Sequence, residues 1–174
     1  LEAQCGHARG SIELLPLITE SAGALLRAAS FTSLPARVAG LTWGAEDLAA
    51  DLGASANRTA DGEYEFTFAL ARSFCLLAAA AAGVPAYDTI DVEFRDAEAV
   101  ERRARASRRQ GFVGKLAIHP SQVAPIHAAF NPTAEEITRA ERVIAAFAAA
   151  PGAGAVAFEG GMLDKPHLRQ AERI

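Results

Sequence analysis

Residues 38–47, VAGLTWGAED, decide the fold class: an apolar run ends at Trp43, and the acids Glu46 and Asp47 follow almost directly. Three similar runs lie at residues 14–18 (LLPLI), 84–90 (VPAYDTI) and 114–118 (GKLAI). Short apolar runs bounded by Gly or Pro are typical of strands buried on both faces, as in a parallel sheet. We therefore expect strands near residues 14–19, 38–43, 84–92 and 114–118.

Helical stretches separate these runs. We expect helices at residues 21–30, 66–82, 97–110, 121–130 and 134–147. Asp96 is a candidate N-cap, Gly83 and Gly111 are candidate helix ends, and Thr133 opens a capping box. Alternating strands and helices predict an α/β fold built from βα units. Because four units do not close a (β/α)8 barrel, the pattern fits either a small open α/β sheet or half of such a barrel.

Pro151 and Gly152 are expected to stop the last long helix and to mark a domain boundary. We expect a partial barrel domain over residues 1–150 and a C-terminal lid over residues 151–174. Within the lid, residues 155–158 are expected to be extended, residues 159–164 to form a loop, and residues 167–174 to form a short helix. The chain begins with Leu1 rather than Met, and we expect it to be a fragment.

Composition excludes several classes of function. The chain has 174 residues and a formal charge of −4, with 17 basic and 21 acidic residues. A mildly acidic chain is poorly suited to bind nucleic acid or an anionic membrane surface. No apolar run is long enough to cross a bilayer. Two isolated cysteines, Cys5 and Cys75, indicate reduced thiols and a cytoplasmic protein, with Cys75 acting as a small buried hydrophobe.

Carboxylates follow two neighbouring predicted strands. Glu20 comes after the first run, and Asp47 comes after the second. In parallel α/β folds the chemistry gathers where strands end, and oxygen ligands without nearby Cys or His suit Mg²⁺. The alternative is structural, because an acid in the first turn of a helix stabilises that helix. The pattern alone leaves both interpretations open.

Other candidate residues have ordinary structural interpretations. His119 precedes Pro120 and is expected to be a hydrogen-bonded structural histidine. Asp164 precedes Lys165 at a helix start, where an N-cap role is common. Five arginines between residues 102 and 109 form a basic cluster, which we interpret as a solvated helix face, with a phosphate contact as the alternative.

Several motifs occur together and in order along nearly the whole chain. They are LPLITESAG (15–23), GAEDLAADLG (44–53), ARS (71–73), GFVGKLAIHPSQ (111–122) and GMLDKP (161–166). In these motifs the chain resembles the citrate lyase beta-subunit-like branch of the HpcH/HpaI aldolase family, which includes malyl-CoA and citramalyl-CoA lyases. The resemblance implies a TIM barrel, of which this chain supplies the last four βα units and a C-terminal segment.

The resemblance also implies a site. Glu20 and Asp47 match the family's Mg²⁺ ligands, and the backbone at Gly44 and Ala45 would touch the carboxylate of a 2-oxo acid. Asp164 would act in proton transfer from a segment that can reach a neighbouring subunit of a homo-oligomer, a trimer or hexamer. The family's N-terminal half, with a substrate-binding arginine, is absent from this chain.

The implied activity is Mg²⁺-dependent cleavage of a carbon–carbon bond in a 3-hydroxyacyl-CoA, which gives a 2-oxo acid and an acyl-CoA. Citryl-, malyl- and citramalyl-CoA are candidate substrates. The alternatives are an aldolase acting on free hydroxy-oxo acids, a non-catalytic subunit of a lyase complex, and a binding domain of Rossmann type without a metal at the strand ends.

Overall fold

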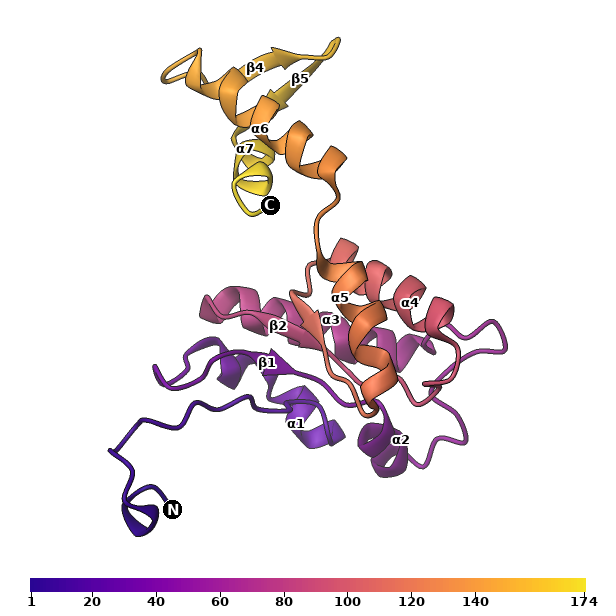
Figure 1. Cartoon of the computed structure of the whole chain (residues 1–174). Helices are drawn as coiled ribbons and strands as arrows, with labels where there is room; N and C mark the ends of the chain where they lie inside the picture. Colours follow the sequence, from indigo (N-terminus) through magenta and orange to yellow (C-terminus); the bar gives the residue numbers. More distant parts are fainter. The chain divides into compact units, whose positions relative to one another are not determined.

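A computed structural model describes residues 1–174, which form two compact units, Leu1–Phe130 and Asn131–Ile174 (Figure 1). The boundary after Phe130 precedes the expected one at residue 150. The difference arises because the long helix α6 (Ala134–Ala148) packs on the strand β4 (Ala155–Phe158) and the helix α7 (Lys165–Ala171). The amphipathic α6 therefore belongs to the C-terminal unit.

A parallel sheet lies at the centre of the first unit. Its strands are β1 (Leu41–Thr42), β2 (Ala86–Asp88) and β3 (Gly114–Lys115), in the order β1-β2-β3. Leu41 pairs with Ala86, and Tyr87 pairs with Gly114. All three strands are shorter than expected, but their positions and parallel direction agree with the α/β prediction.

The first expected strand, residues 14–19, is reduced to two parallel bridges, Leu14 to Val38 and Leu17 to Thr42. Two local features interrupt a regular ladder. Pro16 has no N–H to donate. Between the two bridges, the segment that leads into β1 also contains one residue more than the segment that contains Pro16, as in a bulge. The segment still runs parallel beside β1, so four parallel segments lie side by side.

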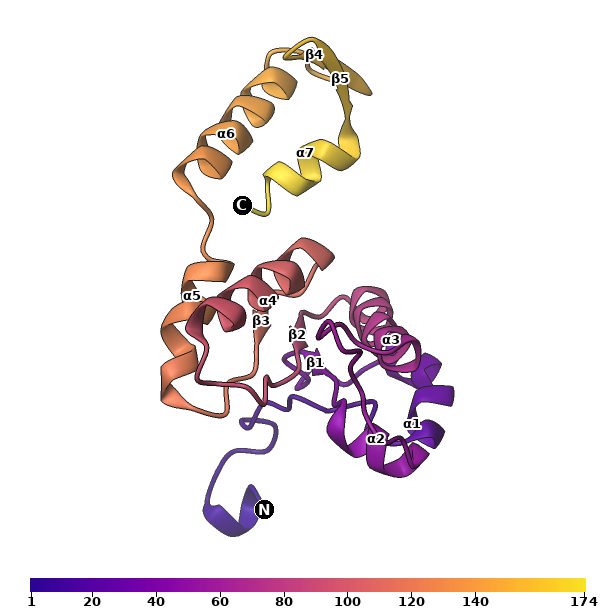
Figure 2. The same cartoon turned by 90° about the vertical axis from the view of Figure 1, so that its right-hand side faces the viewer.

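Helices follow the strands of the first unit (Figure 2). They are α1 (Ala22–Leu26), α2 (Glu46–Leu52), α3 (Phe66–Ala82), α4 (Ala97–Gln110) and α5 (Val123–Phe130), with 3-10 turns at Ala3–Cys5, Ala28–Thr32 and Pro120–Gln122. Asp96 caps α4, and Gly83 and Gly111 end α3 and α4 in the left-handed conformation that glycine adopts without strain. None of these helices, nor those of the second unit, is both long and apolar enough to cross a membrane.

The core of the first unit lies between the sheet and the helices. It includes Leu41 and Trp43 from the strand side, together with Phe68, Ala71 and Cys75 from α3, all of them buried. Small residues on the inner face of α3 let the helix approach the strands closely. Burial raises the pKa of the Cys75 thiol to about 12, so this cysteine is the inert buried hydrophobe that the sequence predicts.

The second unit combines α6 with a β-hairpin and α7. β4 pairs antiparallel with β5 (Gly161–Asp164), and Val143, Phe147 and Val156 form its core. The expected loop at residues 159–164 was therefore wrong. Glu159 and Gly160 both have positive φ, 48° and 80°, and a two-residue turn of this kind suits the twist of a hairpin.

Candidate active site at the strand ends

The two predicted metal ligands follow neighbouring parallel segments. Glu20 comes directly after the segment that bridges to β1, and Asp47 lies in the first turn of α2, which follows β1. Both residues are exposed, whereas Gly44 and Ala45 between β1 and α2 are buried. Because parallel strands end at the same edge of a sheet, Glu20 and Asp47 belong to the same end of the molecule.

Hydrogen bonds join the two segments up to this edge. The Thr42 N–H donates to the Pro16 carbonyl, and the Ile18 N–H donates to the Thr42 carbonyl, both at 3.0 Å. Beyond them, the buried Thr19 hydroxyl accepts from the Gly44 N–H at 3.0 Å and lies 3.2 Å from the Gly44 carbonyl, to which it can donate. The residues before Glu20 and before Asp47 are therefore held to each other.

Glu20 and Asp47 differ from the acids around them. Glu46 accepts a hydrogen bond from Asn57, and Asp51 accepts one from the Ala22 N–H. Neither the Glu20 nor the Asp47 carboxylate takes part in a hydrogen bond or ion pair of the structure. Ser21, not Glu20, supplies the side-chain cap of α1. The capping alternative for Glu20 is therefore not realised.

The donor set at this edge fits a hard divalent cation. Two unpartnered carboxylates are available, and no group of three or more His, Cys, Asp and Glu side chains forms a complete metal cage anywhere in the chain. Mg²⁺ commonly takes one or two protein carboxylates and fills its other positions with water or substrate oxygens. Asp47 also lies in the first turn of α2, where the partial positive charge of the helix start favours an acid. For Asp47, stabilisation of α2 is therefore an alternative to metal binding.

A buried ionic cluster, which sequence reasoning missed, lies beside this edge. Asp88 accepts hydrogen bonds from Trp43 Nε1 at 2.6 Å and from Arg72 at 2.8 and 3.1 Å, and it also bonds the Ser107 hydroxyl. The ammonium group of Lys115 lies 3.7 Å from Asp88 and donates to the Thr89 carbonyl at 2.7 Å. The cluster ties β2 and β3 to α3 and α4.

The charges in this cluster stabilise one another. Burial alone would raise the pKa of Asp88, but the hydrogen bond from Arg72 and the positive charges of Lys115 and Arg72 outweigh it, and the pKa falls to about 2. Burial lowers the pKa of Lys115, and the Asp88 carboxylate opposes that effect. Asp88 is therefore ionised throughout the neutral range, in a position enclosed by α3 and α4.

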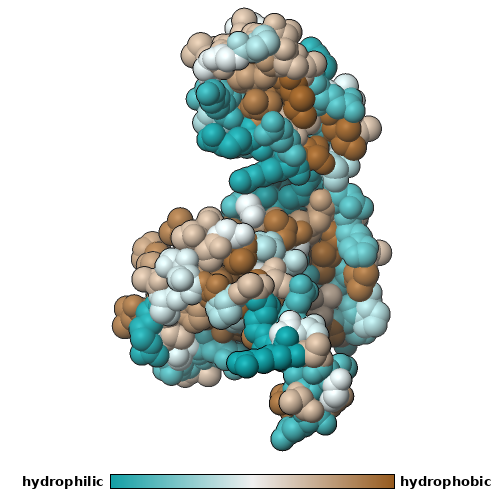
Figure 3. Space-filling view, turned by 90° about the vertical axis from the view of Figure 1, so that its left-hand side faces the viewer, coloured by the Kyte–Doolittle hydropathy of each residue, from teal (hydrophilic) through white to brown (hydrophobic).

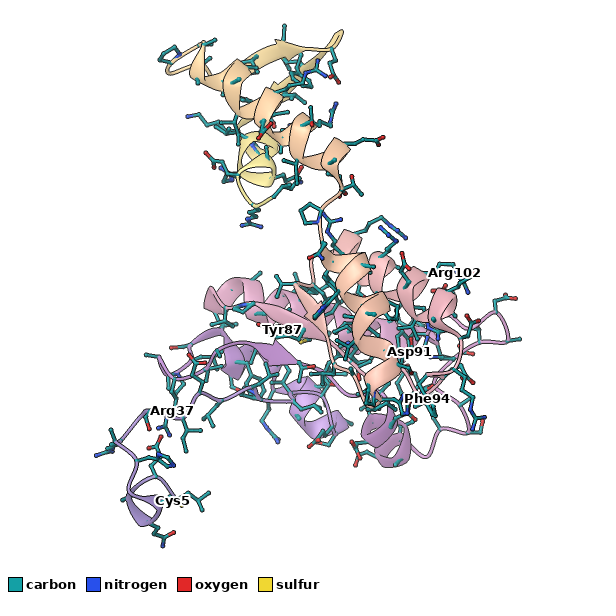
Figure 4. All side chains as sticks on the ribbon, viewed as in Figure 1. Cys5, Arg37, Tyr87, Asp91, Phe94 and Arg102 are labelled. Carbon is teal, nitrogen blue, oxygen red and sulfur yellow. The ribbon has the colours of Figure 1, made fainter.

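Asp91, another acid at a strand end, is also an ion-pair partner. This residue, labelled in Figure 4, is buried and pairs with Arg103 at 2.5 Å, and Arg58 lies 3.9 Å away. Arg103 is one of the five arginines interpreted as a solvated face. That interpretation is right for the exposed Arg102 and wrong for Arg103, because the helix turns Arg103 towards the strand ends.

Asp164 lies in the second unit, at the N-cap position of α7. Its Oδ1 is 2.6 Å from His167 Nδ1, and both side chains are about half exposed. His167 is therefore the immediate partner of the predicted proton-transfer residue. The spacing of three residues across a helix start is the sequence signal that could have identified this pair.

His119 is structural, as the sequence predicts. It stacks on Phe94 with ring centroids 4.5 Å apart, and its Nδ1 lies 2.8 Å from the Ser121 hydroxyl at the start of the 3-10 turn Pro120–Gln122. Gln122, fully buried beneath it, donates to the Asp91 carbonyl at 2.8 Å and accepts from the Ile118 N–H. These contacts stabilise the loop that follows β3.

Parallel strands joined by helices, with acids directly after the strands, place this chain among the α/β proteins whose chemistry lies at the strand ends. The sequence pattern described as HpcH/HpaI aldolase/citrate lyase matches residues 1–120, and the pattern described as a C–C bond lyase of the TIM-barrel fold matches residues 77–174. The chain belongs to the HpcH/HpaI aldolase/citrate lyase family.

Relatives refine this assignment. A citrate lyase subunit beta-like protein of Mycobacterium tuberculosis is 39% identical over 162 residues, which cover 93% of this chain and 58% of the relative. Mitochondrial citramalyl-CoA lyase of Rattus norvegicus is 39% identical over 137 residues, which cover 77% of this chain and 39% of that enzyme. The chain therefore spans about half the length of the relatives that it matches.

A solved structure supports the same relationship. The crystal structure of the protein CitE from Mycobacterium tuberculosis, in complex with magnesium, acetoacetate and coenzyme A, superimposes with a TM-score of 0.78. It is 39% identical in sequence, and the match covers 87% of this chain and 56% of CitE. The family is thus shown by sequence and by structure, and the sequence pattern over residues 77–174 gives the TIM-barrel fold.

Proposed function

We propose that this chain is part of a Mg²⁺-dependent lyase that cleaves a carbon–carbon bond in a 3-hydroxyacyl-CoA, such as citryl-, malyl- or citramalyl-CoA. The observation that carries the proposal is the pair of unpartnered carboxylates, Glu20 and Asp47, after two neighbouring parallel segments. The complex of CitE with magnesium, acetoacetate and coenzyme A supports the same class of ligands. The four parallel segments correspond in this proposal to the last four strands of the barrel.

The proposal gives the site residues different roles in binding and catalysis. Glu20 and Asp47 would hold Mg²⁺, which supplies a Lewis acid for the oxygens of the hydroxy acid. The buried backbone at Gly44 and Ala45 would contact and orient the substrate carboxylate between these ligands, with the Ala45 N–H as the donor because Thr19 already accepts from the Gly44 N–H. Cleavage moves the hydroxyl proton to a base and the bonding electron pair to the acyl-CoA carbon, so an enolate forms and must gain a proton. Asp164 would transfer that proton.

Further parts of the proposal concern the whole protein. A homo-oligomer, a trimer or hexamer, would bring Asp164 of one subunit to the strand ends of another. The acyl-CoA and the 2-oxo acid are the proposed partners, and the two unpaired thiols of Cys5 and Cys75 favour the cytoplasm as the compartment.

The metal site is tested by removing each ligand's charge in the intact protein. We expect Glu20→Gln and Asp47→Asn to lower kcat/KM for malyl- or citramalyl-CoA by at least about 100-fold, because a metal ligand is lost. Glu46→Gln is the matched control, because Glu46 is an exposed acid beside Asp47 that already has a protein partner. Full turnover by Asp47→Asn, unaffected by EDTA, would refute the metal site. Turnover of a free 4-hydroxy-2-oxo acid without a thioester would favour the aldolase alternative.

The role of Asp164 is tested separately. Asp164→Asn keeps the shape of the side chain and removes its titratable proton, so we expect kcat to fall by about 100-fold or more while the Kd for the acyl-CoA changes little. His167→Gln should also lower kcat, because the Nδ1 partner that orients the Asp164 carboxyl is lost. An unchanged kcat in Asp164→Asn would leave Asp164 with only its role at the start of α7.

A further inference from the structure

Thr19 occupies an unusual position between the two proposed metal ligands. It precedes Glu20, and its side chain is buried against Gly44, three residues before Asp47. No sequence pattern distinguishes Thr19, because a threonine at the end of an apolar run is an ordinary strand residue. The structure shows that its hydroxyl uses both the donor and the acceptor group of one backbone residue.

The hydrogen bonds explain why a side chain is needed here. Thr42 bonds the backbone on both sides of Leu17, as a residue in a parallel ladder does. Continued regularly, the next rung would join the Gly44 backbone to the Ile18 carbonyl and to the Glu20 N–H. The Thr19 hydroxyl takes both places instead, at 3.0 and 3.2 Å from the Gly44 nitrogen and oxygen.

Because the Thr19 hydroxyl replaces the backbone groups of this rung, the path of the main chain changes. The main chain leaves the ladder at Thr19, so the Glu20 backbone is free to turn its carboxylate out of the sheet, while the two segments stay joined. Gly44 is close to its neighbours as well, because a Cβ atom there would lie 3.0 Å from Leu17. The last hydrogen bonds that join the two segments before Glu20 and Asp47 are therefore those of one buried hydroxyl.

We propose that Thr19 is a positioning residue that holds Glu20 and Asp47 at the spacing needed to share one divalent cation. The inference rests on the proposed metal site. Groups that orient metal ligands commonly change metal affinity by about 10- to 100-fold when they are removed. Thr19→Val keeps the size and branching of the side chain and removes only the hydroxyl.

The test measures Mn²⁺ binding to the full chain by electron paramagnetic resonance, so it does not depend on turnover. We expect Thr19→Val to weaken Mn²⁺ binding at least about tenfold, and Thr19→Ser, which retains the hydroxyl, to stay within about threefold of the wild type. Thr42→Val is the matched control. This substitution also replaces a buried threonine by valine, but in β1 and at a hydroxyl that makes no hydrogen bond. The Thr42→Val variant should therefore bind Mn²⁺ as the wild type does.

The outcomes separate this inference from the proposed function. If Glu20→Gln abolishes Mn²⁺ binding but Thr19→Val binds normally, the positioning role is wrong and the metal site stands. If Glu20→Gln and Asp47→Asn both bind Mn²⁺ normally, the metal site itself is wrong. Should circular dichroism show that Thr19→Val is unfolded, Thr19→Ala is compared with Thr19→Ser, and equal affinities in that pair overturn the proposal.

Discussion

Asp88 shows at the residue scale how a buried charge is retained in this fold. A carboxylate without partners would lose its proton only at high pH in such a position. Here Arg72, Lys115, Trp43 and Ser107 surround it with hydrogen bonds or positive charge, so it is ionised while buried. Removing one member of a buried pair leaves an uncompensated charge, which costs more than the pair contributes.

We therefore expect Asp88→Asn to lower the free energy of unfolding by about 3–5 kcal/mol, measured by urea denaturation at neutral pH. The folded-state pKa of about 2 lies below the ordinary 3.8. The stabilisation is then complete above about pH 4 and is lost as the pH falls towards 2. This acid-dependent loss should be smaller in Asp88→Asn. The exposed Asp61→Asn is the control, and an equally small effect of both substitutions would contradict the prediction.

At the scale of the element, local signals account for the helices better than for the strands. The limits of α3 and α4 follow from caps: a glycine ends each helix, and the Asp96 side chain accepts a hydrogen bond from the Ala99 N–H at 2.9 Å. Strand lengths instead depend on the neighbouring segment. Pro16 and the extra residue between the two bridges shorten the first strand.

The cap of α4 gives a direct test. Asp96→Ala should lower the free energy of unfolding by about 1 kcal/mol, because the Ala99 N–H loses its acceptor at the helix start. Asp96→Ser retains a capping oxygen and should change the stability by only a few tenths of that amount. Urea denaturation of both variants measures the difference, and equal stabilities of the Ala and Ser variants would count against the cap.

At the scale of the whole molecule, apolar surface remains uncovered. The outer face of α3 carries Phe66, Leu70, Phe74 and Leu77 at helical spacing, and all four are exposed, Phe66 by 78%. Figure 3 shows one face of the molecule, on which apolar residues gather in several places. β3 pairs on one side only, so its other edge has unpaired backbone groups. Such surfaces commonly mark interfaces between subunits.

We expect residues 1–174 to self-associate with increasing concentration, as analytical ultracentrifugation would measure, because the α3 stripe is removed from water in the associated form. Phe66→Gln combined with Leu77→Gln should lower the average mass at a given concentration. Val92→Gln, at an exposed apolar residue outside the stripe, is the control. A monomer at all concentrations would contradict this prediction and weaken the proposed homo-oligomer.

Much of the fold and part of the candidate site could be predicted from the chain itself. Glu20 and Asp47 stand out because each follows a short apolar run, and the parallel arrangement of those runs is confirmed. Asp88 and Lys115 could not be found in this way, because their partners are scattered over α3, α4 and the residue after β1, and no spacing connects them. The β4–β5 hairpin was missed although Glu159 and Gly160 form its turn.

The sequence by itself determined the α/β class, the limits of the long helices α3, α4 and α6, and the acids that follow the strands, because capping, glycine ends and apolar runs act over a few neighbouring residues. Only the tertiary structure decided which acids are buried in ion pairs and which stay unpartnered, since that depends on residues far apart in the chain. The same holds for Thr19, whose hydroxyl has its role only because Gly44 lies beside it.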